Sequence, residues 1–223
     1  MRTRRMRVAG AALVVAALAA SAGCGDPLPQ VQGDLAFVGV NVVPMIEPGV
    51  PLVVENRTVV VTDRRIASMH PADEVEVADG TQVVEAEGMY LAPGLAEMHG
   101  HLPGPRTVQS DARNLLFLYV ANGVTTVRGM QGERSQLGLR ARIARGQSLG
   151  PRLFLGSPSM SGGRVTTPEQ GAQLVREYNQ RGYDLVKMHE GLAPDVFDAV
   201  AATANEVGLP FGGHVPDAVG LRH

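Results

Sequence analysis

Residues 89–101 read MYLAPGLAEMHGH, an apolar run that ends in His99 and His101. Because side chains alternate between the two faces of a β-strand, these two histidines share one side where the predicted strand ends. Imidazole nitrogens are good ligands for Zn²⁺ and neighbouring divalent ions, and a catalytic site adds ligands from elsewhere in the fold. The stretch therefore predicts a metal site. Lys187 and His214 are further candidate ligands because each ends a short apolar run downstream.

The N-terminus predicts export. Four arginines lie within residues 1–7, and residues 8–23 are uncharged and end in small residues, as in a signal peptide. This apolar part is shorter than the roughly 20 residues that a membrane-crossing helix needs. We therefore interpret residues 1–23 as a signal peptide rather than as a permanent anchor helix.

Cys24, the only cysteine, has three interpretations. Its position after residues 21–23 resembles the lipobox of bacterial lipoproteins, in which the cysteine is lipidated and becomes the new N-terminus. Leucine is usual where Ser21 stands, and residues 20–22 would also serve as an ordinary cleavage site that releases a periplasmic or secreted protein. An inert buried cysteine is the third interpretation. We expect a lipid-anchored exported protein, with residues 24–33 as a short Pro-containing tether.

Length and charge limit the classes of function. The chain has 223 residues, and removal of the signal peptide leaves enough for one large or two modest domains. The formal net charge is only −2 and the basic residues outside the signal peptide are scattered, which argues against nucleic acid as a partner. A single cysteine excludes an internal disulfide, even in an oxidising compartment.

Residues 34–93 alternate short apolar runs with turn residues such as Pro48-Gly49 and Asp79-Gly80. Short runs separated by turns are typical of β-structure, and no helical period is apparent. We predict a small antiparallel β unit that forms the N-terminal part of a β-sandwich domain. Its expected strands are Leu35–Val43, Thr58–Val61, Ile66–Met69, Val83–Glu85 and Met89–Leu91.

The pattern changes after Gly94, where short apolar runs alternate with helix-length segments. Such alternation predicts βα units around a parallel sheet, so the expected fold class of residues 94–223 is α/β. About five βα units with candidate ligands at the carboxyl ends of their strands are typical of the first part of a (β/α)8 barrel, a partial TIM barrel. We expect the sequence to be a fragment, truncated before the barrel closes. The expected strands are Gly94–His99, Val124–Arg128, Arg152–Gly156, Asp184–Met188 and Pro210–His214.

Two helices have clear boundary residues. Thr167 is predicted to be an N-cap, with Pro168 at the first helical position and Gln170 placed to complete a capping box. Pro194 begins the next helix, and Gly208 follows its last turn as a glycine that ends helices.

Three motifs together resemble one family. Residues 92–101, residues 183–187 (YDLVK) and residues 213–216 (GHVP) are similar, in type and order, to motifs of the metal-dependent amidohydrolase superfamily. The closest likeness is to the branch that contains imidazolonepropionase and prolidase-like peptidases. The resemblance covers about residues 34–223. It implies a TIM barrel flanked by a β-sandwich that is built from sequence before and after the barrel.

The resemblance implies a role for each of four residues. His99 and His101 match the strand-one pair that binds the more buried metal, and His214 matches the strand-five ligand of the second metal. Lys187 matches the strand-four lysine that is carboxylated by carbon dioxide and bridges two metals. A lysine amine in an apolar strand loses hydration, which favours the neutral form able to capture carbon dioxide as a carbamate. The implied cofactor is a divalent metal, Zn²⁺, as one or two ions.

The sequence also departs from the family pattern. The family's strand-six histidine and its strand-eight aspartate, the proton shuttle, have no counterpart because the chain ends first. The catalytic acid and base therefore stay unassigned. Glu97 stands where the family usually has aspartate, and we expect little from this change.

Two further residues are candidate substrate contacts. His189 lies one pleat repeat beyond Lys187 and would face the mouth of the barrel, where loops after strands contact substrate. Arg128 ends the predicted second strand and would pair with a substrate carboxylate, with a solvated strand-end arginine as the alternative. Residues 161–163 lack the lysine and the helix start of a phosphate-binding loop, so we interpret them as a loop over the site.

The leading hypothesis is an exported hydrolase in which metal-activated hydroxide cleaves the C–N bond of a small amide, cyclic amide or dipeptide. One alternative keeps a single metal and an unmodified Lys187, as in deaminase-like and imidazolonepropionase-like relatives. Another is a non-catalytic surface lipoprotein derived from an amidohydrolase. We expect residues 24–223 alone to be poorly folded and inactive, because the first and fifth barrel strands each lack a neighbour.

Overall fold

The computed structural model describes residues 26–46, 49, 51–104 and 109–222. The predicted signal peptide and Cys24 lie outside these residues. The chain divides into two compact units, one up to Ala92 and one from Pro93 onward, and each is described by itself. Within the described residues, no helix combines the length and the apolar character that a membrane crossing requires.

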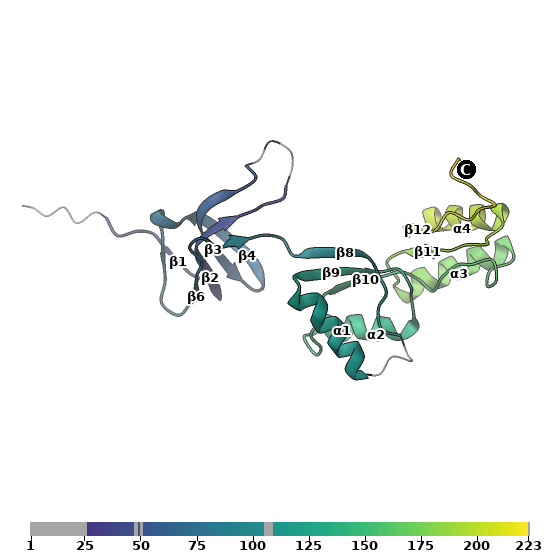
Figure 1. The fold of residues 1–223 in the computed structure, drawn as a ribbon, viewed down its shortest axis with the longest axis horizontal. Helices are drawn as coiled ribbons and strands as arrows, with labels where there is room; N and C mark the ends of the chain where they lie inside the picture. Colours follow the sequence, from purple (N-terminus) through teal and green to yellow (C-terminus); the bar gives the residue numbers. More distant parts are fainter. Residues whose placement is uncertain (1–25, 47–48, 50, 105–108, 223) are drawn as a thin grey trace, which may run out of the picture. The chain divides into compact units, whose positions relative to one another are not determined.

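The first unit consists of β-strands and one short 3₁₀ helix, η1 (Figure 1). Its central strand, β2 (Leu35–Val42), pairs antiparallel with β3 and parallel with β6 and β7. β4 extends the sheet beyond β3, while β1 and β5 form a separate parallel pair. The other bounds are β1 Gln30–Val31, β3 Val54–Thr62, β4 Arg65–Pro71, η1 Ala72–Glu74, β5 Glu76–Val77, β6 Gln82–Glu85 and β7 Tyr90–Leu91.

The prediction of a purely antiparallel unit is wrong. After β4 the chain does not turn back at once. It passes through η1 and β5 and returns on the other side of β2, where β6 runs parallel to it. Part of the predicted tether is also a strand, because Gln30 and Val31 pair with Glu76 and Val77. Apolar runs and turns predict where strands lie, but they do not predict on which side of the sheet the chain returns.

The second unit alternates strands and helices, and its neighbouring strands are parallel (Figure 1). β8 pairs with β9, β9 with β10, and β11 with β12, while bridges from Gly156 to Leu185 and from Met160 to Met188 join the end of β10 to β11. The strands therefore follow one another across the sheet in sequence order, and the expected α/β class is confirmed. The bounds are β8 Leu95–Gly100, α1 Gln109–Ala121, β9 Val124–Gly129, α2 Arg134–Ala144, β10 Arg152–Leu155, α3 Pro168–Arg181, β11 Val186–Met188, α4 Pro194–Glu206 and β12 Phe211–Gly213.

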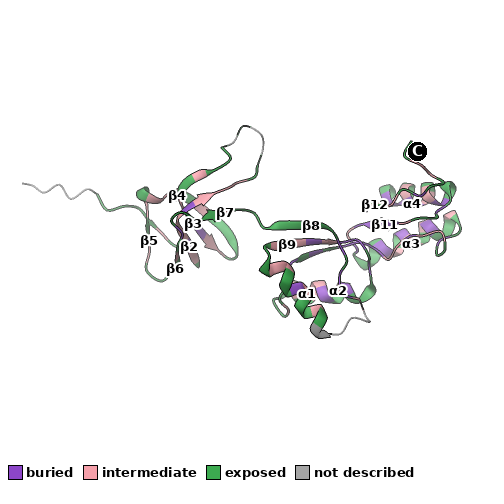
Figure 2. Cartoon of the chain, in the orientation of Figure 1, coloured by how far each residue is buried: buried purple, intermediate pink, exposed green. Residues whose placement is uncertain are grey.

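Burial differs among the strands of this sheet: β8 is mostly exposed, green in Figure 2, β10 alternates between exposed and buried residues, and all three residues of β11 are buried. Leu153 and Leu155 on β10 are at most 4% exposed, whereas Phe154 between them is 42% exposed. Val127 on β9 pairs with Leu153 and is fully buried with it. This is the alternation of a half-buried strand, so Arg128 and Phe154, which pair with each other, lie on the open face.

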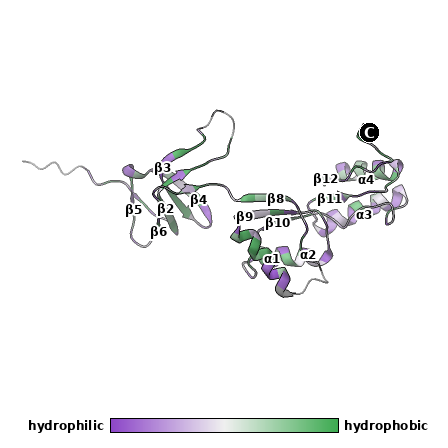
Figure 3. Cartoon of the chain, in the orientation of Figure 1, coloured by the Kyte–Doolittle hydropathy of each residue, from purple (hydrophilic) through white to green (hydrophobic). Residues whose placement is uncertain are grey.

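The helices differ in polarity. Figure 3 shows α1 as hydrophobic over much of its surface and α3 as more hydrophilic. Phe117 and Leu118 on α1 are each 54% exposed. The buried core between helices and sheet includes Leu116, Leu139, Met160, Val175, Tyr178, Met188, Val196 and Val200.

Helix boundaries agree with the sequence in part. Thr167 caps α3 as predicted, with its side chain accepting from the Gln170 N–H, but Gln170 accepts from Thr166 instead of completing the box. α4 begins at Pro194, and Gly208 follows its C-cap with a φ of +69°. A complete capping box occurs instead at α2, whose N-cap is a glutamate.

Candidate metal centre

β8 contains a bulge at the first candidate ligand. Three steps along β8, from Glu97 to Gly100, match only two steps along β9, so Met98 and His99 together lie opposite the single residue Arg128. The extra residue reverses the alternation of side chains. Glu97 and Gly100 therefore share the α1 side of the sheet, and His99 lies on the open face with Arg128.

The bulge removes one peptide group from the ladder, and two side chains bind it. Arg128 donates from Nε to the carbonyl oxygen of Met98 at 2.7 Å. The backbone N–H of His99 donates to Oε1 of Glu97, also at 2.7 Å. Both polar groups of the Met98–His99 peptide thus have side-chain partners, which a peptide outside the ladder needs.

His99 lies within electrostatic range of the other predicted ligands. Loss of hydration lowers its pKa below the usual range of histidine, and the charges of Lys187, His101, His214 and Arg128 lower it further, in that order. The ring centres of His99 and His101 are 5.8 Å apart. The charges that act on His99 thus come from residues at β8, β9, β11 and the end of β12. A lowered pKa favours neutral imidazole, which is the form that binds metal.

Lys187 is a buried cation without a counter-ion. It lies in the middle of β11, is 2% exposed, and forms no ion pair with any residue that the structure describes. Burial lowers the pKa of its amine, and the charge of Arg128 lowers it further. Its backbone N–H donates to Oγ of the buried Ser157 at 3.0 Å, where β10 has left the ladder. This setting favours a neutral, nucleophilic amine.

His214 follows β12 and returns to β11. Its N–H donates to the Met188 carbonyl at 3.1 Å, and its ring stacks on His189 with 4.3 Å between ring centres. Nδ1 of His214 is 3.2 Å from Oε1 of Glu190. When Nδ1 of His214 carries the proton and donates it in a hydrogen bond to Glu190, Nε2 keeps its lone pair for a metal, an arrangement common among metal-binding histidines. Gly213 permits the close approach, because a Cβ there would lie 2.2 Å from the Met188 oxygen.

The two candidate substrate contacts are both near the predicted ligands. His189 is half-buried against His214, and Arg128 influences His99 and Lys187 by charge. The Nε of Arg128 is already bound to the β8 backbone, so only its terminal nitrogens are available to a substrate carboxylate.

The chemistry of the donor set fits a metal centre. Three imidazoles offer nitrogen donors that Zn²⁺ accepts, and a lysine carboxylated by carbon dioxide would add oxygen donors. The buried, uncompensated Lys187 is the observation that favours such chemistry, because a carbamate carries the opposite charge. In the part of the chain that the structure describes, no three His, Cys, Asp or Glu side chains are grouped closely enough to hold an ion. The candidate centre therefore depends on Lys187.

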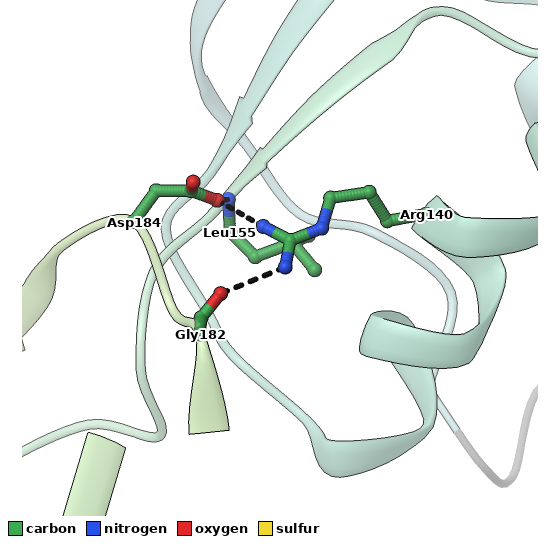
Figure 4. Close-up of polar contacts among 4 residues, drawn as sticks. All are labelled: Arg140, Leu155, Gly182 and Asp184. Atoms are coloured by element: carbon green, nitrogen blue, oxygen red, sulfur yellow. Dashed lines mark hydrogen bonds and ion pairs between the residues drawn. The ribbon is translucent and has the colours of Figure 1, made fainter. Parts of the chain in front are cut away.

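A different polar network fixes the start of β11 (Figure 4). Asp184 accepts from Nη1 of Arg140 at 2.5 Å and from the Leu155 N–H at 2.7 Å, through the same oxygen. Nη2 of Arg140 donates to the Gly182 carbonyl at 2.7 Å. The network joins α2, β10 and the segment before β11, and none of its members is a candidate ligand.

Comparisons with protein-family models and with curated proteins find no match. Comparison with solved structures does. A protein assigned as a prolidase from Bifidobacterium longum matches with a TM-score of 0.70 and 22% identity, over 83% of this chain and 50% of its own. A prolidase complexed with N-methylphosphonate-L-proline gives 0.68 and 18%, over 81% and 56%. A further amidohydrolase also gives 0.68 and 18%, over 81% and 56%.

The chain has the fold of these solved prolidase-like and amidohydrolase proteins. The family likeness expected from the sequence is thereby confirmed at the level of the fold. The chain spans about half the length of the solved structures that it matches. In βα-barrels, active sites lie at the carboxyl ends of the parallel strands, where loops surround them.

Sequence reasoning missed three residues of this site. The sequence predicts little effect of Glu97, ends a strand at Gly156 just before Ser157, and assigns no role to Glu190. The first two bind backbone groups that irregular pairing leaves unpartnered, and a sequence does not show irregular pairing. Glu190 follows His189 in a loop after a strand, a position that was a usable hint.

Proposed function

We propose that the complete gene product is a metal-dependent hydrolase of carbon–nitrogen bonds in small amides, cyclic amides or dipeptides. The observation that carries this proposal is the buried Lys187, which has no counter-ion among the described residues and acts by charge on His99, on a fold similar to that of amidohydrolases. A lysine with a structural role would be expected to form an ion pair. Titratable groups with shifted pKa values, in contrast, are concentrated at functional sites.

Lys187 supplies an anionic ligand after reaction with carbon dioxide. The neutral amine attacks the carbon of carbon dioxide, a C–N bond forms, and one proton leaves the nitrogen for solvent. The product is a carbamate whose two oxygens bind cations. Burial and the Arg128 charge both favour the neutral amine that this reaction needs.

The other ligands are held by backbone geometry. His99 and His101 would hold the first ion, and His214 would hold a second ion that the Lys187 carbamate shares. When bound, the metal would lower the pKa of water and polarise the scissile carbonyl. Glu190 orients His214 through Nδ1. Arg128 and His189 remain the candidate contacts for a substrate carboxylate and for the group beyond the scissile bond.

Metal analysis and mass spectrometry of the complete gene product test this function. We expect one or two Zn²⁺ per chain, a Lys187 mass increase of one carbon dioxide under native conditions, and hydrolysis of Xaa-proline dipeptides or N-acyl amino acids. The prolidase neighbour with a proline phosphonate motivates the first substrate set. A folded protein without divalent metal contradicts the proposal.

A mononuclear centre with unmodified Lys187 is the alternative mechanism. One ion per chain and a Lys187 of unchanged mass would select it. A surface lipoprotein without catalysis is the alternative of another class, and a metal-free, folded and inactive gene product would select that.

We also propose that β8–β12 are the first strands of an eight-stranded barrel. The sequential parallel order of the strands and the half-length match to amidohydrolases support this. Reading the gene downstream tests it, because a further histidine-bearing strand and a later aspartate-bearing strand are expected. A stop codon directly after His223 would contradict it.

Export and lipidation are a separate proposal. The arginine-rich start and Cys24 support a lipid-anchored protein outside the cytoplasm. Labelling with a radioactive fatty acid and detergent phase partitioning test it, with Cys24→Ser as the control. Equal partitioning of both proteins into the aqueous phase would favour a released protein.

A further inference from the structure

The Met98–His99 peptide is held from both faces of the sheet. Its carbonyl accepts from Nε of Arg128 on the open face, and its N–H donates to Glu97 on the α1 side, both at 2.7 Å. A regular strand would satisfy these groups by backbone pairing, but the bulge places two residues opposite Arg128 and leaves the peptide outside the ladder. The side chains therefore replace a missing section of the ladder.

The bulge decides where His99 points. In regular alternation, Glu97 and His99 would share one face, because they are two residues apart. The extra residue separates them, so Glu97 faces α1 while His99 lies on the open face with Arg128. Gly100 permits this arrangement, since a Cβ there would lie 2.6 Å from Cγ1 of Val127.

We propose that Glu97 and Arg128 are positioning residues that clamp the Met98–His99 peptide and thereby aim the His99 imidazole at the metal. This inference rests on the metal centre proposed above. It gives Arg128 a role through the backbone instead of, or before, a contact with substrate. It also gives a role to Glu97, which accepts a hydrogen bond from the backbone N–H of His99.

The hydrogen bond from Arg128 and the charge of Arg128 should affect metal affinity in opposite directions. Arg128 is a cation near the site, so its charge opposes the binding of Zn²⁺. An exchange that keeps the charge and removes the Nε–H therefore isolates the hydrogen bond. Arg128→Lys is that exchange, because lysine carries its donors only at the tip. Glu97→Gln keeps an acceptor oxygen without the charge, and Glu97→Ala removes both.

The experiment measures Zn²⁺ dissociation constants of the complete gene product by chelator competition, together with the visible spectrum of the Co²⁺-substituted protein. We expect Glu97→Ala and Arg128→Lys each to weaken Zn²⁺ binding by about 10- to 100-fold and to alter the Co²⁺ bands. Glu97→Gln should weaken binding by less than about threefold, since it keeps the hydrogen bond. Because the two residues bind one peptide, the double variant should lose less than the product of the single effects.

Arg176→Lys and Glu206→Ala are matched controls, because they change the same residue types in an exposed pair on α3 and α4. They should leave both readouts unchanged. Unaltered protein that binds no divalent metal overturns the proposed function and the clamp together. Metal binding that is normal in the unaltered protein, in Glu97→Ala and in Arg128→Lys overturns the clamp alone. If Glu97→Ala does not fold, normal Zn²⁺ affinity and Co²⁺ bands in Arg128→Lys still overturn it.

Discussion

Asp184 and Lys187 belong to the same short segment around β11, and their surroundings differ in kind. Asp184 precedes the strand, and its carboxylate pairs with Arg140 and accepts a hydrogen bond from the Leu155 N–H (Figure 4). Lys187, within the strand, is more deeply buried and has no counter-ion among the described residues. The carboxylate just before the strand therefore has partners, whereas the amine within the strand has no counter-ion among the described residues. Stability and chemistry are divided between the two ends of the strands in βα-barrels.

Replacement of the uncompensated charge should have the largest effect. Lys187→Met should abolish the second metal and reduce hydrolysis by roughly 100-fold or more, because it removes a proposed ligand. The free energy of unfolding should not fall, since an apolar side chain of similar length replaces a buried cation. Metal counting, turnover and urea denaturation check this. Retained metal together with lower stability would make Lys187 a structural residue.

Replacement of the compensated charge should do the reverse. Asp184→Ala should lower the free energy of unfolding by roughly 2–3 kcal/mol, because Arg140 and the Leu155 N–H both lose their acceptor. The protein that remains folded should keep its metal. Urea denaturation is the measurement, and Asp184→Asn, which retains an acceptor oxygen, should lose less. A loss of metal without a loss of stability would show that Asp184 supports the metal site and not the stability of the fold.

Ser157 connects the two behaviours. Ser157→Ala leaves the Lys187 N–H without its acceptor in a buried place, which should cost about 1–2 kcal/mol of stability. It should also weaken metal binding, because the strand that carries Lys187 loses an anchor. Denaturation and chelator competition on one preparation check both effects. A change in neither would mean that the backbone N–H finds water.

An exposed ion pair should show the smallest effect. Arg176 and Glu206 pair at 2.8 Å with side chains 46% and 63% exposed. Arg176→Ala should lower the free energy of unfolding by at most about 0.5 kcal/mol, since solvent and salt screen the pair. Thermal denaturation at low and high salt checks this. A loss above 1 kcal/mol would show that the solvent exposure of an ion pair does not determine how much it stabilises this protein.

Much of the second unit follows from the sequence, for a physical reason. Its strands are short apolar runs between helix-length segments, and each predicted strand overlaps an observed one. The ends are less predictable. Asp184 was placed inside a strand, yet it precedes β11 because its carboxylate binds Arg140 and Leu155. A side chain that serves a neighbouring element leaves no periodic pattern.

The parts that the sequence does not predict depend on partners far along the chain. The bulge at Met98 and His99 exists only relative to β9, so the alternation rule alone would group Glu97 with the histidines. The parallel return of β6 beside β2 has the same origin. The α2 capping box begins with Glu133, outside the usual serine, threonine, aspartate and asparagine set.

The sequential order of the parallel strands also bears on how the protein is assembled during synthesis. Each strand of the second unit docks on the one made just before it, so the sheet can grow from its N-terminal edge without waiting for distant sequence. β12 pairs with β11 along Val186–Met188, and a Cβ at Gly213 would lie 3.1 Å from Cδ of Lys187, so the arrival of β12 contributes to the enclosure of this side chain. If Lys187 captures carbon dioxide as proposed above, we expect this capture to follow the docking of the fifth strand and to report that docking.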